Sequence, residues 1–133
     1  MAVISNNTFF LKDVVITIGT DEYTSAFRDP ALTPTAPEVT VVDASGTARP
    51  FVGKSSYRFT GVLYQDWTAT GLAKAWQTGE GTQATIKYKL PGTQGVWTAI
   101  VVLKATQIGG NTNGVAEASV DLPVVGTPTW SAT

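Results

Sequence analysis

Apolar and polar residues alternate along several short segments of this 133-residue chain, and this two-residue period constrains the fold more than any other feature. Successive side chains of a β-strand point to opposite faces of a sheet, so the alternation predicts strands with one face toward a core. Gly, Pro and Asn residues, which favour turns, separate the segments. We expect six strands, over residues 13–19, 38–43, 57–65, 82–90, 96–106 and 115–122.

One segment, residues 69–78, shows the helical period instead, because its apolar residues recur at spacings of three and four. Thr68 or Thr70 can cap the first turn, since a hydroxyl accepts from the free backbone N–H groups there. Gly79 is a candidate for the left-handed stop at the other end. The apolar stripe of this helix consists of Ala69, Leu72, Ala73 and Trp76.

Four segments lack a clear period, and we expect them to be arms and loops around one domain of residues 1–133. Residues 1–11 form an N-terminal arm and residues 123–133 a C-terminal arm punctuated by proline. Residues 20–37 are polar and contain three prolines, so they predict a long loop. Residues 44–56 predict a second long loop, either a hairpin connection or an extended flap.

These elements predict an all-β dominated (α+β) fold, a β-sandwich or barrel of about six or more strands flanked by one short α-helix. Gly61 in the middle of a strand indicates a bulge or a close backbone neighbour. The expected core is Val14, Ile16, Ile18, Phe59, Leu63, Trp67, Leu72, Trp76, Ile86, Tyr88, Trp97, Val101 and Leu103.

The absence of Cys and His restricts the chemistry that this chain can perform. Disulfides and thiolate metal sites are impossible, and the commonest general base and metal ligand is missing. Asp21, Glu22 and Asp29 are close in sequence, but they fit solvated loop charges better than an acid–base pair, and their spacing matches no calcium loop. We therefore expect no catalytic residue, no cofactor and no metal, and a protein that is not an enzyme.

Charged residues make up only 14% of the chain, against about 25% in an ordinary soluble domain. A surface so poor in charge indicates that copies of the protein cover one another, or alternatively that it is a threonine-rich β-domain. No basic run favours strong DNA binding, and neither a signal peptide nor a membrane span is apparent. The candidate inter-subunit residues are Phe9, Phe10, Phe27, Phe51, Ile100, Val102 and Trp130.

Residues 59–77, FTGVLYQDWTATGLAKAWQ, resemble the signature stretch of the major tail proteins, or tail tube proteins, of long-tailed bacteriophages. There a Phe-x-Gly-x-Leu strand runs into an Asp-Trp step and then the single helix. The later order is also similar, with Tyr88 near a strand end, a Gly-Gly turn at 109–110 and a Gly-Thr-Pro-Thr close at 126–129. Residues 10–19 resemble the family's first strand, so the resemblance covers nearly the whole chain.

This resemblance implies a structural virion protein that assembles with itself into hexameric rings stacked into a tube, the conduit for DNA ejection. Its further partners would be the tape-measure, tail tip and terminator proteins, and its location the phage tail after assembly in the bacterial cytoplasm. The two long loops and the two arms are then candidates for ring-to-ring contacts. The alternative function is a receptor- or carbohydrate-binding β-module, such as a capsid decoration or tail fibre domain; a hydrolase is disfavoured by the missing His.

A DNA conduit should not attract phosphates, and carboxylates on its wall would repel them. We therefore expect Glu117, Ser119 and Asp121, on one face of a strand, to point toward the lumen. The alternative is an ordinary solvent face whose carboxylates pair with Lys87 and Lys89.

Overall fold

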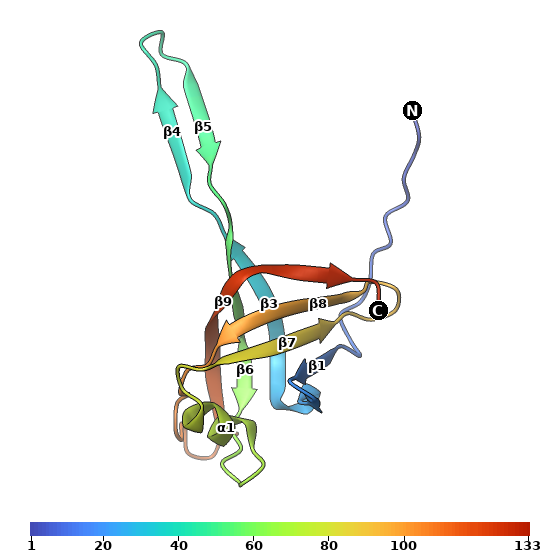
Figure 1. The fold of residues 1–133 in the computed structure, drawn as a ribbon, viewed down its shortest axis with the longest axis vertical. Helices are drawn as coiled ribbons and strands as arrows, with labels where there is room; N and C mark the ends of the chain where they lie inside the picture. Colours follow the sequence, from blue (N-terminus) through green and yellow to red (C-terminus); the bar gives the residue numbers. More distant parts are fainter.

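The computed structural model describes residues 1–133 as a curled antiparallel sheet of seven strands, a projecting two-stranded hairpin and one short helix (Figure 1). The sheet and hairpin are built from β1 (Val15–Ile18), β2 (Asp21–Glu22), β3 (Phe27–Thr35), β4 (Glu38–Val42), β5 (Ala48–Val52), β6 (Ser56–Tyr64), β7 (Gln83–Lys89), β8 (Val96–Val102) and β9 (Glu117–Ser131). The 3₁₀-helix η1 spans Thr24–Ala26 and the α-helix α1 spans Leu72–Thr78. The order across the large sheet is β2-β1-β7-β8-β9-β6-β3, and β4 pairs only with β5.

The long strand β9 joins the two halves of the sheet. Its first part, up to Pro123, pairs with β6, and its second part, from Val124, pairs with β8. Gly126 lies within the second part, where the register against β8 shifts between Thr98 and Ile100. Its φ of +72° is a left-handed conformation that glycine adopts without strain. Figure 1 shows β9 curving from one half to the other. The resulting architecture, mostly β with a single short helix, confirms the fold class expected from the sequence.

The core lies inside the curl of the sheet, and α1 closes one end of it. The helix contributes Leu72, Ala73 and Trp76, which are all buried. Four residues expected in the core, Val14, Ile18, Trp67 and Trp97, are only partly buried and pack against it. The remaining expected core residues are all buried: Ile16, Phe59, Leu63, Leu72, Trp76, Ile86, Tyr88, Val101 and Leu103.

Residues 20–37 are not a loop, because they contain β2, η1 and β3. Pro30 and Pro34 interrupt the alternation that would have predicted a strand here. However, β3 is an edge strand, and an edge strand tolerates residues without an N–H donor. The register of β3 against β6 shifts between Arg28 and Ala31. Gly61 of β6 lies opposite this irregularity, and a Cβ there would come 3.2 Å from the Pro30 Cα. The close backbone neighbour expected at Gly61 is confirmed.

Phe27 is a second correction, because this candidate for a subunit contact is only 8% exposed and lies in the core. Its ring meets Phe59 edge-on, with centroids 5.5 Å apart and planes at 89°. Trp76 of α1 also packs against it, with ring centroids 5.9 Å apart. The prediction was wrong because β3 was taken for a loop, and β3 carries Phe27 inward beside β6.

The expectation that residues 123–133 form a C-terminal arm was also wrong. Residues 124–131 are the second part of β9, and Trp130 lies opposite Trp97 of β8. Gly126 and Pro128 break the alternation there, so the sequence pattern did not reveal the strand. The loop expected at 44–56 likewise contains β5, which forms the hairpin flap with β4. Two further boundaries differ from the expected strands 96–106 and 115–122, because β8 ends at Val102 and β9 begins at Glu117.

The helix starts and stops differently from the expectation. Gly71 is its N-cap residue and no side chain caps the first turn, because the Thr68 hydroxyl donates to Asp66 instead. Gly79 follows the last turn with φ of −94°, so it is not left-handed. Gly81 supplies that conformation two residues later, with φ of +86°.

Candidate assembly surface

The β4–β5 hairpin is exposed along its whole length, and Figure 1 shows it projecting far from the body. All of its strand residues are exposed, including Val39, Val41 and Val42 on β4 and Phe51 (58%) and Val52 on β5. Val39 lies opposite Phe51, and Val52 lies opposite Glu38 on the other face. Both faces therefore carry apolar side chains that no part of the chain covers. A two-stranded hairpin is marginally stable in water, so this element favours a covering partner.

Apart from Phe51, the apolar residues of the hairpin were missed as candidate contacts. Two strand-like segments flank the sequence Asp43 to Thr47, and both segments carry apolar residues at neighbouring positions, so neither has a purely polar face. That pattern is the signal that could have found them.

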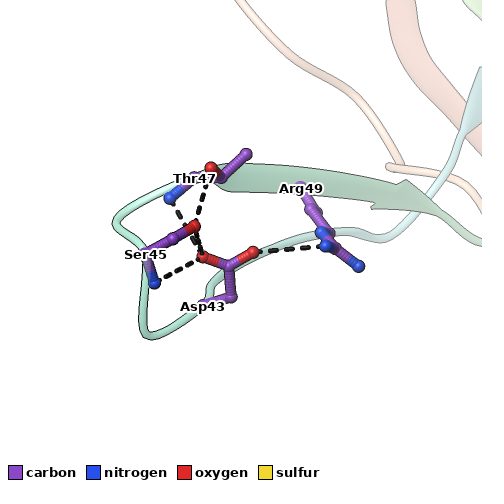
Figure 2. A network of polar contacts seen from close by, with 4 residues as sticks. All are labelled: Asp43, Ser45, Thr47 and Arg49. Carbon is purple, nitrogen blue, oxygen red and sulfur yellow. Dashed lines mark hydrogen bonds and ion pairs between the residues drawn. The ribbon is translucent and has the colours of Figure 1, made fainter.

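The tip of the hairpin is organised by Asp43 (Figure 2). Its Oδ1 accepts from the backbone N–H groups of Ser45, at 2.9 Å, and Thr47, at 3.1 Å, and from the Ser45 hydroxyl. Its Oδ2 lies 3.2 Å from the Arg49 guanidinium. These donors lower the pKa of the Asp43 carboxyl, and the Ser45 hydroxyl has the largest effect. Gly46, with φ of +83°, completes a turn whose shape is set by its own side chains.

The N-terminal arm, residues 1–11, is a second exposed apolar segment and contains no helix or strand. Phe10 is 80% exposed, and Phe9 is exposed as well. The Gln94 amide donates to the Asn7 carbonyl, 3.2 Å away, and so ties the arm to the turn between β7 and β8. In Figure 1 the arm and the β4–β5 hairpin extend beyond the same end of the body.

An apolar groove of about 340 Å³ lies where the arm enters the body. Leu11 of the arm lines it together with Leu32 of β3, Tyr57 of β6 and Trp97 of β8. The Tyr88 hydroxyl at this groove already donates to the Pro30 carbonyl, at 2.9 Å. The groove thus suits an apolar side chain better than a polar ligand.

The outer surface of β8 and β9 carries the remaining candidate contacts. Ile100 is exposed and pairs with exposed Val125, while Val102 is half-buried. Trp130 is 54% exposed, and its indole N–H donates to the Gln94 carbonyl at 2.9 Å. The ring covers Gly95 so closely that a Cβ there would lie 2.3 Å from the indole nitrogen. Trp130 therefore contacts its own subunit and still offers a free face.

Glu117, Ser119 and Asp121 lie on one face of β9 and alternate with the buried residues of the opposite face. Arg28 of β3 pairs with Glu117 at 3.1 Å, and Arg58 of β6 pairs with Asp121. Each carboxylate on this face of β9 thus has an arginine partner.

Lys87 and Lys89 are not those partners. They belong to β7, which β8 separates from β9 in the sheet. The lysine that does approach is Lys104, whose Nζ donates to the Asp121 backbone carbonyl at 3.3 Å.

Besides Asp43, the pKa of Asp66 is lowered, first by the Thr68 hydroxyl, and burial raises the pKa of Tyr88. These groups serve a turn and an interior contact. No cluster of three or more acidic side chains lies close enough together to hold a metal ion. No helix has the length and apolar character that crossing a membrane requires.

Comparison with known proteins finds similarity in structure alone. No protein-family model matches the sequence, and no curated protein matches it either. Among solved structures, the chain is similar to a chain in the virion of a native gene transfer agent (GTA) particle, with a TM-score of 0.68 and 16% identity over 90% of this chain and 96% of that one. A chain in the tail of an empty GTA particle, solved by helical refinement with C6 symmetry, gives the same TM-score and coverage at 17% identity. At this identity the similarity establishes a shared fold, and the fold it establishes is one found in the virion and tail of a GTA particle.

Proposed function

We propose that this protein is a structural subunit of a phage-type tail, and that its copies form hexameric rings that stack into the tail tube. The observation that carries the proposal is the fold similarity to a chain of a C6-symmetric GTA tail, which spans 90% of this chain and 96% of the other. The sequence resemblance of residues 59–77 to tail tube proteins supports the same assignment independently.

The exposed apolar segments support self-assembly on physical grounds. The β4–β5 hairpin and the N-terminal arm present large apolar side chains to solvent, and the isolated chain has nothing to cover them. Burying such surface is the main favourable term in association, worth about 25 cal/mol per Å² before the costs of ordering. A heterologous contact of this kind closes into a ring or continues as a filament.

The face of β9 with Glu117, Ser119 and Asp121 is our candidate for the wall of the lumen. Its carboxylates are balanced by Arg28 and Arg58, so the face is close to neutral rather than strongly acidic. A neutral wall neither holds phosphates nor repels them strongly, which suits DNA that passes through without specific binding.

The proposed role is structural and non-enzymatic, and it needs no cofactor. The partners would be other copies of the chain, the tape-measure protein inside the tube, and the tip and terminator proteins at its two ends. The assembled protein would be located in the virion tail, after assembly in the cytoplasm of the bacterial host.

Electron microscopy of the concentrated purified protein tests this function. Sixfold rings or tubes of stacked rings are the expected result. Discrete particles that bind glycans would instead support a receptor-binding module. A protein that stays monomeric at high concentration, and is missing from the tails of its native particles, would overturn the proposal.

A further inference from the structure

The hydrogen-bonding pattern of the β4–β5 hairpin can be read from two bonds at its ends. The Asp43 N–H donates to the Thr47 carbonyl at 3.1 Å, and the Gly53 N–H donates to the Pro37 carbonyl at 2.7 Å. Bonded and non-bonded pairs alternate along an antiparallel ladder. The pair Thr40 and Pro50 is therefore non-bonded, and the backbone groups of both residues point away from the hairpin.

This pattern makes the two outer edges of the hairpin unequal. On β5 the outward position in the middle of the strand is Pro50, which has no N–H to donate. On β4 the outward residues are Glu38, Thr40 and Val42, and each keeps its N–H and carbonyl. The outer edge of β4 can accept another strand, whereas that of β5 is blunted.

The other strands that end a sheet are poorer sites for strand addition. The strand β2 has two residues, and β3 contains Pro30 and Pro34. Among the four edge strands, only β4 combines a length of five residues with a backbone N–H on every residue.

The N-terminal arm has the properties of a strand that lacks a sheet. Residues 2–11 contain no proline and no charged side chain, and their apolar side chains are exposed. Within residues 1–7 no backbone N–H donates to another backbone group. Six extended residues span about 20 Å, enough to follow the roughly 17 Å of a five-residue strand.

We propose that the N-terminal arm of a second copy adds to the outer edge of β4 as a third strand. This inference rests on the proposed self-assembly and names the contact that makes it. The third strand pairs the free backbone groups of both segments and turns a marginal two-stranded hairpin into a three-stranded sheet. The hairpin and the arm extend beyond the same end of the body (Figure 1), so side-by-side copies can exchange them around a ring.

A matched pair of proline substitutions tests the edge. Thr40→Pro removes an outward N–H of β4, and Ala48→Pro removes an outward N–H of β5. Neither N–H belongs to the ladder between the two strands, so both variants should keep the hairpin and the thermal unfolding of the body. We expect Thr40→Pro to raise the concentration at half-assembly by about tenfold, and Ala48→Pro to leave it within about twofold of wild type. Equal behaviour of the two variants would overturn the inference.

Cysteine cross-linking tests the occupant, in a chain that has no cysteine of its own. A size-tagged Thr40→Cys protein is mixed under oxidising conditions with Val3→Cys, and in a second mixture with Ile4→Cys. A mixed-size disulfide dimer should form with one of them, because adjacent strand residues face opposite sides. Tagged Val52→Cys is the control, because β5 lies one strand farther, about 10 Å away and beyond disulfide reach.

The possible outcomes separate this inference from the proposed function. If the wild-type protein forms rings and no mixed dimer appears, another segment covers β4 and the inference fails while the function stands. The inference also fails if tagged Val52→Cys cross-links to the arm as readily as tagged Thr40→Cys does. In a chain that carries both Val3→Cys and Thr40→Cys, a disulfide that forms only within one chain, and never between two chains, would overturn it as well. A wild-type protein that forms no rings at all contradicts the proposed function instead.

Discussion

The Tyr88 hydroxyl on β7 donates to the Pro30 carbonyl on β3, at 2.9 Å and away from solvent. The two strands lie far apart in the order of the sheet, so the bond forms only because the sheet curls until its halves meet. Removing the hydroxyl leaves a carbonyl without its partner inside the protein.

We expect Tyr88→Phe to lower the free energy of unfolding by about 1–2 kcal/mol, measured by urea denaturation. Tyr57→Phe is the matched control, since Tyr57 lines the same groove and its hydroxyl has no protein hydrogen-bond partner. Burial raises the pKa of Tyr88 above its ordinary value of 10.0. The stability that the protonated hydroxyl contributes is therefore complete below pH 10.0 and is lost as the pH rises through the folded pKa. Equal losses in the two variants would contradict the role of the hydrogen bond.

Phe27 and Phe51 should separate folding from assembly. Phe27 is buried and packs against both Phe59 and Trp76, so Phe27→Ala should lower the free energy of unfolding by about 3–5 kcal/mol. Phe51 projects from the hairpin, so Phe51→Ala should change the stability of the monomer by less than about 0.5 kcal/mol and weaken assembly. Chemical denaturation and sedimentation measure the two effects. A Phe51→Ala protein that assembles normally would remove Phe51 from the contact surface.

The sequence revealed the elements whose period is regular and missed those interrupted by special residues. The alternation in β6, β7 and β8 predicted these three strands, and the spacing of Leu72, Ala73 and Trp76 predicted the helix. Strand β3 was missed because its prolines interrupt the pattern of an edge strand, and the second part of β9 because Gly126 and Pro128 interrupt its alternation. In both places tertiary position makes a residue acceptable that local propensity disfavours.

The candidate contact surface was less predictable than the core. Burial decides whether an aromatic residue is core or interface, and burial depends on which strands become neighbours. Phe27 and Phe51 therefore look alike in sequence although one is 8% and the other 58% exposed. The ion pairs of Glu117 and Asp121 with arginines depend in the same way on the order β9-β6-β3, which the pattern of alternation does not contain.

Acid should loosen the tip of the hairpin before it affects the body. The hydrogen bonds of Asp43 lower its pKa below the ordinary 3.8, so their contribution is present above pH 3.8 and is lost as the pH falls through the folded pKa. Asp43→Ala should remove these hydrogen bonds altogether at neutral pH. Faster amide hydrogen exchange at Ser45 and Thr47 would report it, because both N–H groups donate to this carboxylate. Asp43→Asn, which keeps one acceptor oxygen, is the control and should exchange more slowly than Asp43→Ala.

Reversing the charges of Glu117 and Asp121 should affect the passage of DNA more than the formation of the tube. Glu117→Lys with Asp121→Lys places four cations, with Arg28 and Arg58, on a face that is now balanced. If this face lines the lumen, it will attract phosphates and slow DNA ejection from particles that carry the variant, most strongly at low salt.

Two further variants separate lumen charge from the loss of the ion pairs. Glu117→Gln with Asp121→Asn breaks the pairs and leaves Arg28 and Arg58 as two cations, so ejection should slow less than with the double lysine. Adding Arg28→Gln and Arg58→Gln to that variant makes the face neutral and should restore the wild-type rate. Because these pairs are partly exposed at the surface, breaking them should cost each subunit only about 0–1 kcal/mol per pair, and tubes should still form in every variant. Wild-type ejection by the double lysine variant in intact tubes would place this face of β9 outside the lumen.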